Sequence, residues 1–389
     1  MRRIAVITLL AGLLASAAPA VAQSTAPATA PAAQSADPGV LFWTPQRREA
    51  DFRRMAEIVP HAVVKASETP RALVAGAPLD LDVDAFIAAE RVAGLMVIQD
   101  GKVRLERYGL GMTADDPWVS FSMTKSLTST LVGAAIRDGH IGGLDDQVVA
   151  HLPEMKGSAY DGVTLRQLLT MTSGVAWNED YTDPNADVAR MLVVAPDPGV
   201  DATISYMRRL PRAATPGTRW HYNTGETNLV GVLLARAVGK PLSQYLSETI
   251  WRPAGMARDG QWLLDAGGKE VGGCCVSATL QDWGRVGMLL LDQGRIDGRA
   301  VTPDDWFGMA TRKQADIGLP GRGYGFQWWT TDAGTFDARG IFGQMIHVDP
   351  ERRLAVVILS AWPVATGRER SAARDAFLER VRQAVDAGG

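Results

Sequence analysis

The chain has 389 residues, of which 46% are hydrophobic and 21% charged, and its formal net charge is −3 at pH 7. This balance gives no basis for binding nucleic acid, which requires clustered Lys and Arg. Two cysteines are too few for the disulfide framework of small secreted domains. The length suits one large domain or two closely joined ones.

Residues 1–22 have the pattern of an export signal, with two arginines at the start, an apolar run over 4–14 and small residues over 20–22. The apolar run is too short to span a bilayer as an uncleaved anchor. We therefore expect an exported chain that begins at Gln23, is periplasmic in a Gram-negative source, and has no stable membrane insertion. Residues 23–37 are rich in Ala, Pro, Ser and Thr, which predicts a disordered leader.

The next segments predict helices and a hairpin. A charged run over 47–58 and a short segment over 82–90 are typical of helices. Two apolar stretches, 95–98 and 103–106, flank Asp100 and Gly101, whose sequence favours a tight β-turn. These features predict an antiparallel pair of strands near the start of a sheet.

Residues 140–275 favour helices and loops, with few convincing strands. Thr164 and Gln167 form a capping-box pattern ahead of a short helix. An apolar helix is expected after Tyr222, and Thr279 is placed to cap another. This part of the chain is therefore predicted to be mostly helical.

Strand signals return towards the C-terminus. Residues 324–329, 340–348 and 354–359 carry aromatic or β-branched side chains between turn signals, and residues 368–385 predict an amphipathic helix. Sheet-forming segments thus lie at both ends of the chain. We expect an α/β fold, an antiparallel sheet flanked by helices with an inserted mostly helical region.

These patterns give a domain prediction. The domain would occupy residues 38–389, with an α/β part over about 38–139 and 276–389 and a helical part over about 140–275. No internal repeat is found. Residues 38–389 are therefore assigned to one large domain.

Ser122-x-x-Lys125 stands at the start of a predicted helix that ends near Gly139. Lys125 lies one turn further along the same face, within reach of the serine hydroxyl. A serine attacks a carbonyl only if a neighbour takes its proton, and a lysine does so only when its pKa is lowered. N–H groups at the helix start suit an oxyanion. The pattern also occurs on ordinary surface helices, so alone it leaves both interpretations open.

The two cysteines, Cys274 and Cys275, are adjacent. They permit a vicinal disulfide, a bond to another chain, or two packed thiols. We favour the thiols, because Gly272, Gly273 and Val276 around them indicate a tight buried turn.

Three motifs follow in order: Ser122-x-x-Lys125, Tyr222-x-Thr224 and the glycine-rich segment Gly340–Gln344. Their order and spacing resemble the penicillin-recognising serine hydrolases, in the class C β-lactamase-like branch. That branch includes D-amino-acid peptidases, family VIII esterases and 6-aminohexanoate-dimer hydrolases. The resemblance covers most of the mature chain and implies a β-lactamase/DD-peptidase-like fold.

The resemblance also implies roles. Ser122 would be the acylated nucleophile, Lys125 would accept its proton, and Tyr222 would pass a proton to the leaving group. Thr224 stands where the family has Asn or Ser and keeps a hydroxyl for Lys125 or for substrate. The oxyanion hole would use the backbone N–H groups of Ser122 and Gln344. Because Lys125 and Tyr222 would titrate as a coupled pair, either remains a candidate for the main base.

The third motif departs from the family. Ile341, Phe342 and Gly343, which we assign to the substrate-binding strand, stand in place of Lys-Thr-Gly. Arg339 lies on the same strand face and is a candidate replacement for the cation, although a surface ion pair is the favoured interpretation. Without that cation, turnover of anionic β-lactams is disfavoured. A less anionic amide or ester is therefore expected as substrate. The sequence Gly-Ile-x-Gly-Gln resembles that of 6-aminohexanoate-dimer hydrolases.

A second loop is a candidate for substrate contact. Asn178 and Tyr181 lie in an aromatic and acidic stretch, and a tyrosine in the oligomer-hydrolase branch suggests that one of them contacts substrate. A polar loop anchored by two aromatic residues is the alternative.

The sequence contains no motif that points to another catalytic chemistry. The chain has no His-Glu-x-x-His pattern, no Gly-x-Ser-x-Gly elbow and no phosphate-binding loop, so we expect neither a metal nor a cofactor. We predict an exported serine hydrolase that cleaves a small amide or ester through a Ser122 acyl-enzyme. A β-lactamase or D-amino-acid peptidase is the first alternative, and a catalytically silent penicillin-binding-type module is the second.

Overall fold

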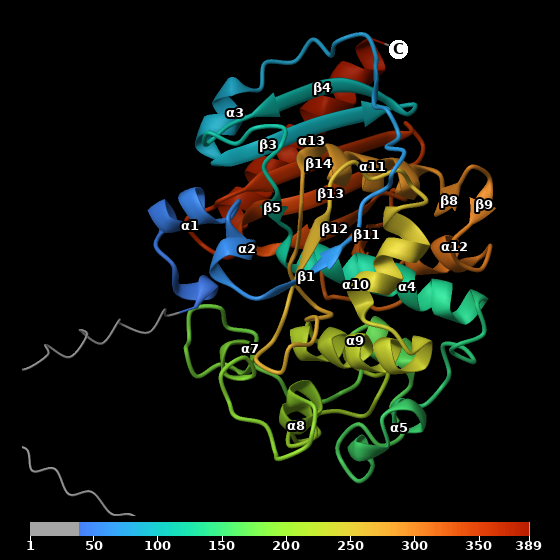
Figure 1. Ribbon diagram of the computed structural model, residues 1–389. Coiled ribbons are helices and arrows are strands. Elements are labelled where there is room, and N and C mark those ends of the chain that lie inside the picture. The colour runs from blue at the N-terminus through green and yellow to red at the C-terminus, as the bar shows by residue number, and fades with distance from the viewer. Residues whose placement is uncertain (1–38, 389) are drawn as a thin grey trace, which may run out of the picture. The chain divides into compact units, whose positions relative to one another are not determined.

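The computed structural model describes residues 39–388, which fold around an eight-stranded sheet (Figure 1). Neighbouring strands pair antiparallel, except that β2 is parallel to β4. In order across the sheet, the strands are β10 (Arg322–Tyr324), β11 (Trp329–Thr331), β12 (Phe336–Gly340), β13 (Gln344–Asp349), β14 (Leu354–Ser360), β3 (Val92–Gln99), β4 (Lys102–Tyr108) and β2 (Val74–Ala75).

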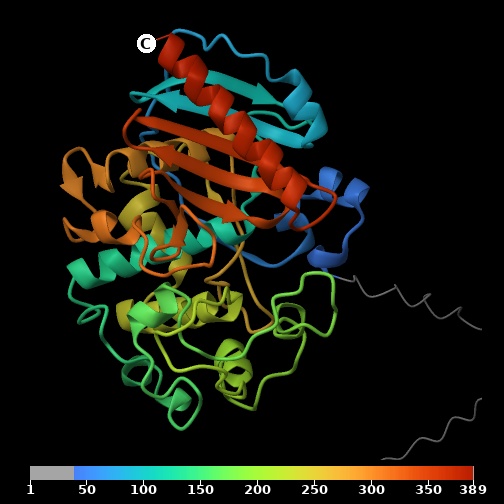
Figure 2. The same cartoon turned by 180° about the vertical axis from the view of Figure 1, so that it is seen from behind.

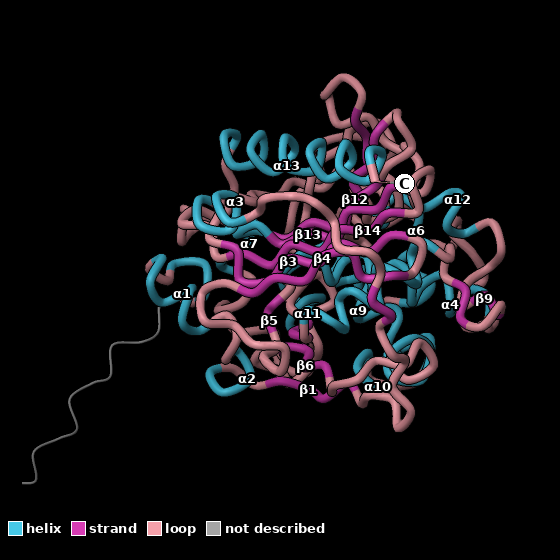
Figure 3. The backbone as a smooth tube through the Cα atoms, turned by 90° about the horizontal axis from the view of Figure 1, so that it is seen from above, coloured by secondary structure: helices cyan, strands magenta, loops and turns pink. Residues whose placement is uncertain are grey.

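Helices cover both faces of this sheet. The C-terminal helix α13 (Arg368–Ala387) crosses one face, and α11 (Leu280–Leu291) contacts β3, β13 and β14 on the other (Figure 2). Figure 3 shows the sheet between these two helices. Along β14, Val356 packs with the α13 side of the core and Val357 with the α11 side, as the two-residue period of a strand requires. The predicted fold class, a sheet flanked by helices, is confirmed.

The inserted helical region contains α9 (Thr224–Val238) and several short helices. Helix α4 (Thr124–Arg137) contacts both α9 and β12, so it lies between the helical region and the sheet (Figure 1). The other helices of the region are α5 (Val148–His151), η3 (Pro153–Met155), α6 (Leu165–Leu169), α7 (Asp187–Arg190), α8 (Ala202–Met207), α10 (Leu242–Leu246) and the π-helical turn η4 (Ser247–Trp251).

The remaining elements frame the two parts. A four-stranded sheet has the order β1 (His61–Val64), β6 (Gly260–Leu263), β7 (Val276–Ala278) and β5 (Trp118–Val119). The others are η1 (Val40–Phe42), α1 (Pro45–Asp51), α2 (Met55–Ile58), α3 (Asp84–Ala89), η2 (Phe121–Met123), β8 (Arg295–Ile296), β9 (Arg299–Ala300), α12 (Trp306–Ala310) and η5 (Ile341–Gly343).

Most predicted elements form where expected. The capping box joins Thr164 and Gln167, and the Thr279 side chain caps α11 by accepting from the Asp282 N–H. The hairpin around Asp100 and Gly101 is β3–β4. Each of these signals is local, so it does not depend on distant packing.

Two strand predictions were wrong. Residues 324–329 form a turn between the end of β10 and the start of β11, not one strand. Residues 340–348 likewise bend at η5, between β12 and β13. At this bend Phe342 has φ 61° and Gly343 has φ 95°, left-handed values that end a strand. Apolar composition alone does not distinguish a strand from a tight hairpin turn.

The helix predicted over 47–58 is interrupted between α1 and α2. The signal-peptide and leader predictions fall on residues 1–37, which lie outside the described residues. From residue 39 to 388, no helix is both long and apolar enough to cross a membrane.

Candidate active site

The backbone before Ser122 is held in an unfavourable conformation. Phe121 has φ 47°, which is rare for a bulky residue. Its ring packs against Phe52, from the N-terminal segment, and Phe342, from the η5 turn, at centroid distances of 5.0 and 5.2 Å. Gly340 adds to this contact, because a Cβ there would lie 2.3 Å from the Ser120 carbonyl oxygen. Ser122 is therefore fixed by segments that are remote in sequence.

Lys125 is buried one helical turn beyond Ser122 and donates three hydrogen bonds. The Nζ atom lies 3.1 Å from Ser122 Oγ, 3.1 Å from Thr224 Oγ1 and 2.7 Å from the Gly273 carbonyl oxygen. Three donors thus meet three acceptors. Burial lowers the pKa of Lys125 to about 8, against an opposing effect of Glu179. The lysine therefore loses its proton far more easily than an exposed one.

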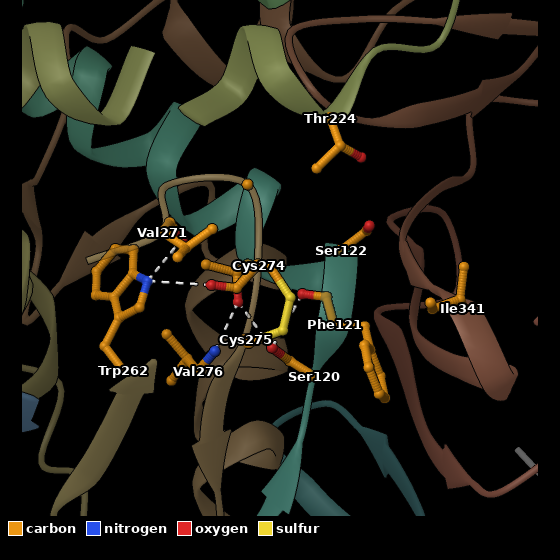
Figure 4. Close-up of a disulfide and its surroundings, with 12 residues drawn as sticks. Ser120, Phe121, Ser122, Thr224, Trp262, Val271, Cys274, Cys275, Val276 and Ile341 are labelled. Carbon is orange, nitrogen blue, oxygen red and sulfur yellow. Dashed lines mark hydrogen bonds between the residues drawn. A yellow bond between two sulfur atoms is a disulfide. The ribbon is translucent and has the colours of Figure 1, made fainter. Parts of the chain in front are cut away.

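The segment around Gly273 runs beside the Ser122 turn. A Cβ at Gly273 would lie 2.8 Å from Asn228 Oδ1 and 3.3 Å from Lys125 Nζ, so a side chain has no room. The Cys275 N–H donates to the Phe121 carbonyl at 3.3 Å (Figure 4). These contacts hold the Gly273 carbonyl, which accepts from Lys125, close to the backbone that precedes Ser122.

The expectation of two free thiols was wrong. The structure joins Cys274 and Cys275 in a disulfide that lies beside Phe121 and Ser122 (Figure 4). The Cys274 carbonyl accepts from Trp262 Nε1, and Cys275 has φ 83°. The tight buried turn was correctly expected, but the bonding of the sulfurs was not.

Tyr222 and Thr224, at the start of α9, lie beside Lys125. The Asn223 side chain caps this helix by accepting from the Glu226 N–H at 3.1 Å. Lys125 Nζ lies 5.3 Å from the centre of the Tyr222 ring, which stacks on Trp329. Burial and Glu179 raise the pKa of Tyr222 well above its usual value, although hydrogen bonding with Ser122 opposes them. At neutral pH Tyr222 is therefore a phenol that can donate or relay a proton.

Glu179 is the polar residue that sequence reasoning missed. Its carboxylate accepts from the Thr224 N–H at 3.0 Å, from the Tyr181 hydroxyl at 2.7 Å, and from the Thr224 hydroxyl. Since Thr224 gives its hydroxyl proton to Glu179, its oxygen accepts from Lys125. The sequence did carry a signal for Glu179. This residue lies two positions before Tyr181, in the acidic and aromatic loop that was predicted to contact substrate.

A pocket of about 320 Å³ opens beside Ser122, within the range of small-molecule sites. It brings together residues from the helical region, the sheet and the C-terminal helix. They are Ser122, Glu179, Tyr181, Tyr222, Trp329, Arg339, Gly340, Ile341, Trp362, Ala365, Thr366, Ser371 and Arg374.

Some predicted substrate contacts lie elsewhere. Tyr181 and Ile341 line the pocket, but Asn178 is exposed and its side chain accepts from the Asp180 N–H. Phe342 is buried against Phe52. Gly343 has no room for a Cβ beside Trp362. These last two residues shape the η5 turn and do not face the pocket.

Gln344, whose backbone N–H was predicted for the oxyanion hole, does not line the Ser122 pocket. It is fully buried, and its side-chain amide accepts from Trp118 Nε1 at 3.1 Å and donates to the Ser360 carbonyl at 2.7 Å. Because the chain turns at η5, Ile341 lies on the pocket wall beside Ser122 (Figure 4).

Residues 39–388 contain no group of three or more His, Cys, Asp or Glu side chains that could hold a metal ion. Ser122, Lys125 and Tyr222 instead form a serine–lysine–tyrosine cluster between a helical region and a sheet. This fold and this cluster define a serine hydrolase of the penicillin-recognising type.

The chain belongs to the β-lactamase family, whose model matches residues 80–380. It is 29% identical over 379 residues to 6-aminohexanoate-dimer hydrolase from Paenarthrobacter ureafaciens, covering 91% of this chain and 96% of that protein. It is 26% identical over 199 residues to esterase EstB from Burkholderia gladioli, covering 46% of this chain and 50% of that protein. A solved structure described as a 6-aminohexanoate-dimer hydrolase from Bacillus anthracis superposes with a TM-score of 0.79 and 21% identity, covering 91% and 98% of the two chains.

Proposed function

We propose that this protein is an exported serine hydrolase that cleaves small amides or esters through an acyl-enzyme on Ser122, without a cofactor. The observation that carries the proposal is the environment of Lys125. A neutral amine keeps two N–H donors, which the Gly273 carbonyl and the Thr224 hydroxyl oxygen occupy. Its lone pair is then left facing the Ser122 hydroxyl, the remaining neighbour that can give it a proton.

In the first half of the reaction, Ser122 Oγ attacks the carbonyl carbon while its proton passes to Lys125 Nζ. The N–H groups of Ser122 and Ile341 stabilise the oxyanion. The bond to the leaving amine or alcohol then breaks, and the leaving group takes a proton delivered through Tyr222.

In the second half, water attacks the acyl-enzyme and gives a proton to the Lys125–Tyr222 pair. The carboxylic acid leaves and the Ser122 hydroxyl regains its proton. The names of the relatives, an amide-dimer hydrolase and an esterase, support an amide or ester substrate.

A fluorophosphonate probe tests the nucleophile. Intact mass is expected to show one adduct on the wild-type protein and none on Ser122→Ala. Absence of an adduct on the folded wild type, or an adduct that survives the substitution, would overturn the proposal.

The general acid–base roles have their own test. Lys125→Ala and Tyr222→Phe are each expected to lower turnover by roughly 10² or more, the scale of losing a positioned proton carrier. Circular dichroism checks that each variant is folded. A near-normal rate in either variant would show that its role is misassigned.

The substrate class is tested by side-by-side rates on p-nitrophenyl butanoate, a linear amide dimer and nitrocefin. Faster turnover of the ester or amide is expected. Nitrocefin turnover well above both would favour the β-lactamase alternative, and no turnover of any would favour the silent module.

Export rests on the signal-like sequence before Gln23. In a Gram-negative host, the protein recovered from the periplasm is expected to begin at Gln23 by N-terminal sequencing. Full-length protein confined to the cytoplasm would contradict this part of the proposal.

A further inference from the structure

The side chain of Gln344 is fully buried and holds the η5 turn. Its Nε2 donates to the carbonyl oxygens of Ile341 at 3.3 Å, Phe342 at 3.2 Å and Ser360 at 2.7 Å. Its Oε1 accepts from the Ser360 N–H at 3.0 Å. A buried amide whose polar atoms are all bonded fixes the geometry of the groups around it. The turn that carries Ile341 is therefore fastened to the end of β14.

The same amide also reaches the segment that carries the nucleophile. Gln344 Oε1 accepts from Trp118 Nε1 at 3.1 Å. Trp118 is fully buried in β5, four residues before Ser122. Strands β5 and β13 belong to different sheets, so strand pairing does not set their relative position. The hydrogen bond between Trp118 and Gln344 thus joins two separately built parts of the site.

Packing brings the same two segments together at two further points. A Cβ at Gly340 would lie 2.3 Å from the Ser120 carbonyl oxygen, and the Phe342 ring lies 5.2 Å from that of Phe121. Packing limits how closely the segments approach, whereas a hydrogen bond is directional. We therefore assign to the Gln344 amide the position of one segment along the other.

This position matters for the reaction because each segment supplies one N–H group to the oxyanion. Ile341 lies across from Ser122 (Figure 4), and both donors must point at one oxygen atom. Resting on the proposed function, we propose that Gln344 is a positioning residue, whose side chain sets the Ile341 N–H relative to the Ser122 N–H through Trp118. Gln344 itself does not line the pocket.

Trp118→Phe tests the link, since it removes the indole donor and leaves the Gln344 amide bonded to Ser360. On p-nitrophenyl butanoate, kcat is expected to fall by roughly 10- to 100-fold with little change in KM, because a displaced donor weakens the transition state more than substrate binding.

Trp283→Phe is the matched control. Its ring is equally buried, on α11, but its Nε1 has no hydrogen-bond partner among residues 39–388 and it does not line the pocket. It is expected to keep kcat near the wild-type value. Thermal unfolding checks that both variants are folded at the assay temperature. Equal losses of kcat in the two variants would overturn the proposal.

A thionoester gives a readout that a purely structural role would not move. In the thionoester analogue of p-nitrophenyl butanoate, the negative charge develops on sulfur, a weaker hydrogen-bond acceptor than oxygen. The wild type and Trp283→Phe are expected to prefer the oxygen ester by the same factor. Trp118→Phe is expected to lower that preference by roughly tenfold, since its donors no longer converge. An equal fall for both substrates in Trp118→Phe would overturn the positioning role.

Gln344→Met tests the other end of the hydrogen bond. It is expected to lower kcat at least as much as Trp118→Phe, and adding Trp118→Phe to it is expected to cost little more, because the bond is already lost. Losses that multiply in the double variant would contradict the link. If Gln344→Met does not fold, the comparison of Trp118→Phe with Trp283→Phe decides by itself.

Fluorophosphonate labelling separates this inference from the proposed function. An unlabelled Ser122 in the folded wild type would overturn both. Complete labelling of wild type and Trp118→Phe, together with equal kcat values, would refute only the positioning role of Gln344. Complete labelling with the expected loss of kcat and of oxygen preference would support both.

Discussion

Two opposing effects set the protonation of Lys125. Burial favours the neutral amine, whereas Glu179 favours the ammonium. Glu179 also receives the Thr224 hydroxyl proton, so it orients one of the acceptors of Lys125. At the scale of single residues, a carboxylate outside the three motifs therefore tunes the predicted base.

The pH dependence of kcat/KM follows from this balance. For the wild type, kcat/KM on an amide substrate is expected to rise with pH and to level off above the Lys125 pKa of about 8. Removing the charge with Glu179→Gln lowers that pKa, so the rise is expected to shift to lower pH. Steady-state rates between about pH 5 and pH 10 measure the shift. A shift to higher pH would contradict the role given to Glu179.

Glu226 gives a second residue-scale prediction. Burial raises its pKa from 4.5 to about 8, although hydrogen bonds from Ser173 and Tyr160 oppose this shift. Because the folded pKa is raised, the contribution of Glu226 to stability is fully present below pH 4.5 and is lost as pH rises towards 8. Glu226→Gln cannot ionise, so at pH 9 it is expected to unfold with a free energy a few kcal/mol higher than the wild type.

Urea unfolding at pH 9 and pH 5 measures this difference, which is expected to shrink at the lower pH. The exposed Glu57→Gln serves as the control and should change stability by less than about 0.5 kcal/mol. An equal effect of Glu226→Gln at both pH values would rule out the linkage.

At the scale of elements, the β12–β13 hairpin and the 271–276 segment carry the parts of the site that local sequence did not resolve. The hairpin turns at η5 and presents Ile341, in place of Gln344, to the pocket. The 271–276 segment supplies the Gly273 carbonyl. Both are irregular backbone held by tertiary contacts, so their geometry does not follow from residue periodicity.

Gly273→Ala tests the second element. Its Cβ would meet Asn228 Oδ1 at 2.8 Å and the Thr224 carbonyl at 2.9 Å, so the segment must shift away from Lys125. Turnover is expected to fall by roughly 10- to 100-fold, the cost of misplacing a catalytic group slightly. The control Gly268→Ala, with open space around it but φ 74°, measures backbone strain alone and should leave kcat nearly unchanged. Equal losses in both variants would contradict the specific role of Gly273.

The Cys274–Cys275 disulfide is tested by alkylation. Denatured, unreduced protein is expected to take up no iodoacetamide, and reduced protein to take up two equivalents, as followed by intact mass. Two alkylated thiols before reduction would restore the interpretation as free cysteines.

At the scale of the whole molecule, the helical region and the sheet share one hydrophobic core. A single core cluster includes Trp43, Leu168, Leu233 and Trp362, which come from both ends and from the insertion. The pocket likewise takes Tyr222 from the insertion and Arg374 from the C-terminal helix. The two parts are therefore expected to unfold together.

Thermal unfolding checks this cooperativity. Far-ultraviolet circular dichroism and tryptophan fluorescence are expected to give coincident transitions, and a fluorophosphonate adduct should shift both equally. Separate midpoints for the two probes would show that the helical region unfolds independently.

The sequence alone determined the order of elements, the main sheet at the two ends of the chain and the Ser122, Lys125 and Tyr222 motifs, because periodicity, caps and motif spacing are local properties. Only the tertiary structure decided that Glu179 bonds to Thr224, that Ile341 and not Gln344 lines the pocket, and that Arg374 also lines it. These residues meet Ser122 through chain turns and helix packing between distant segments. Their separation in sequence therefore carries no signal of their contact.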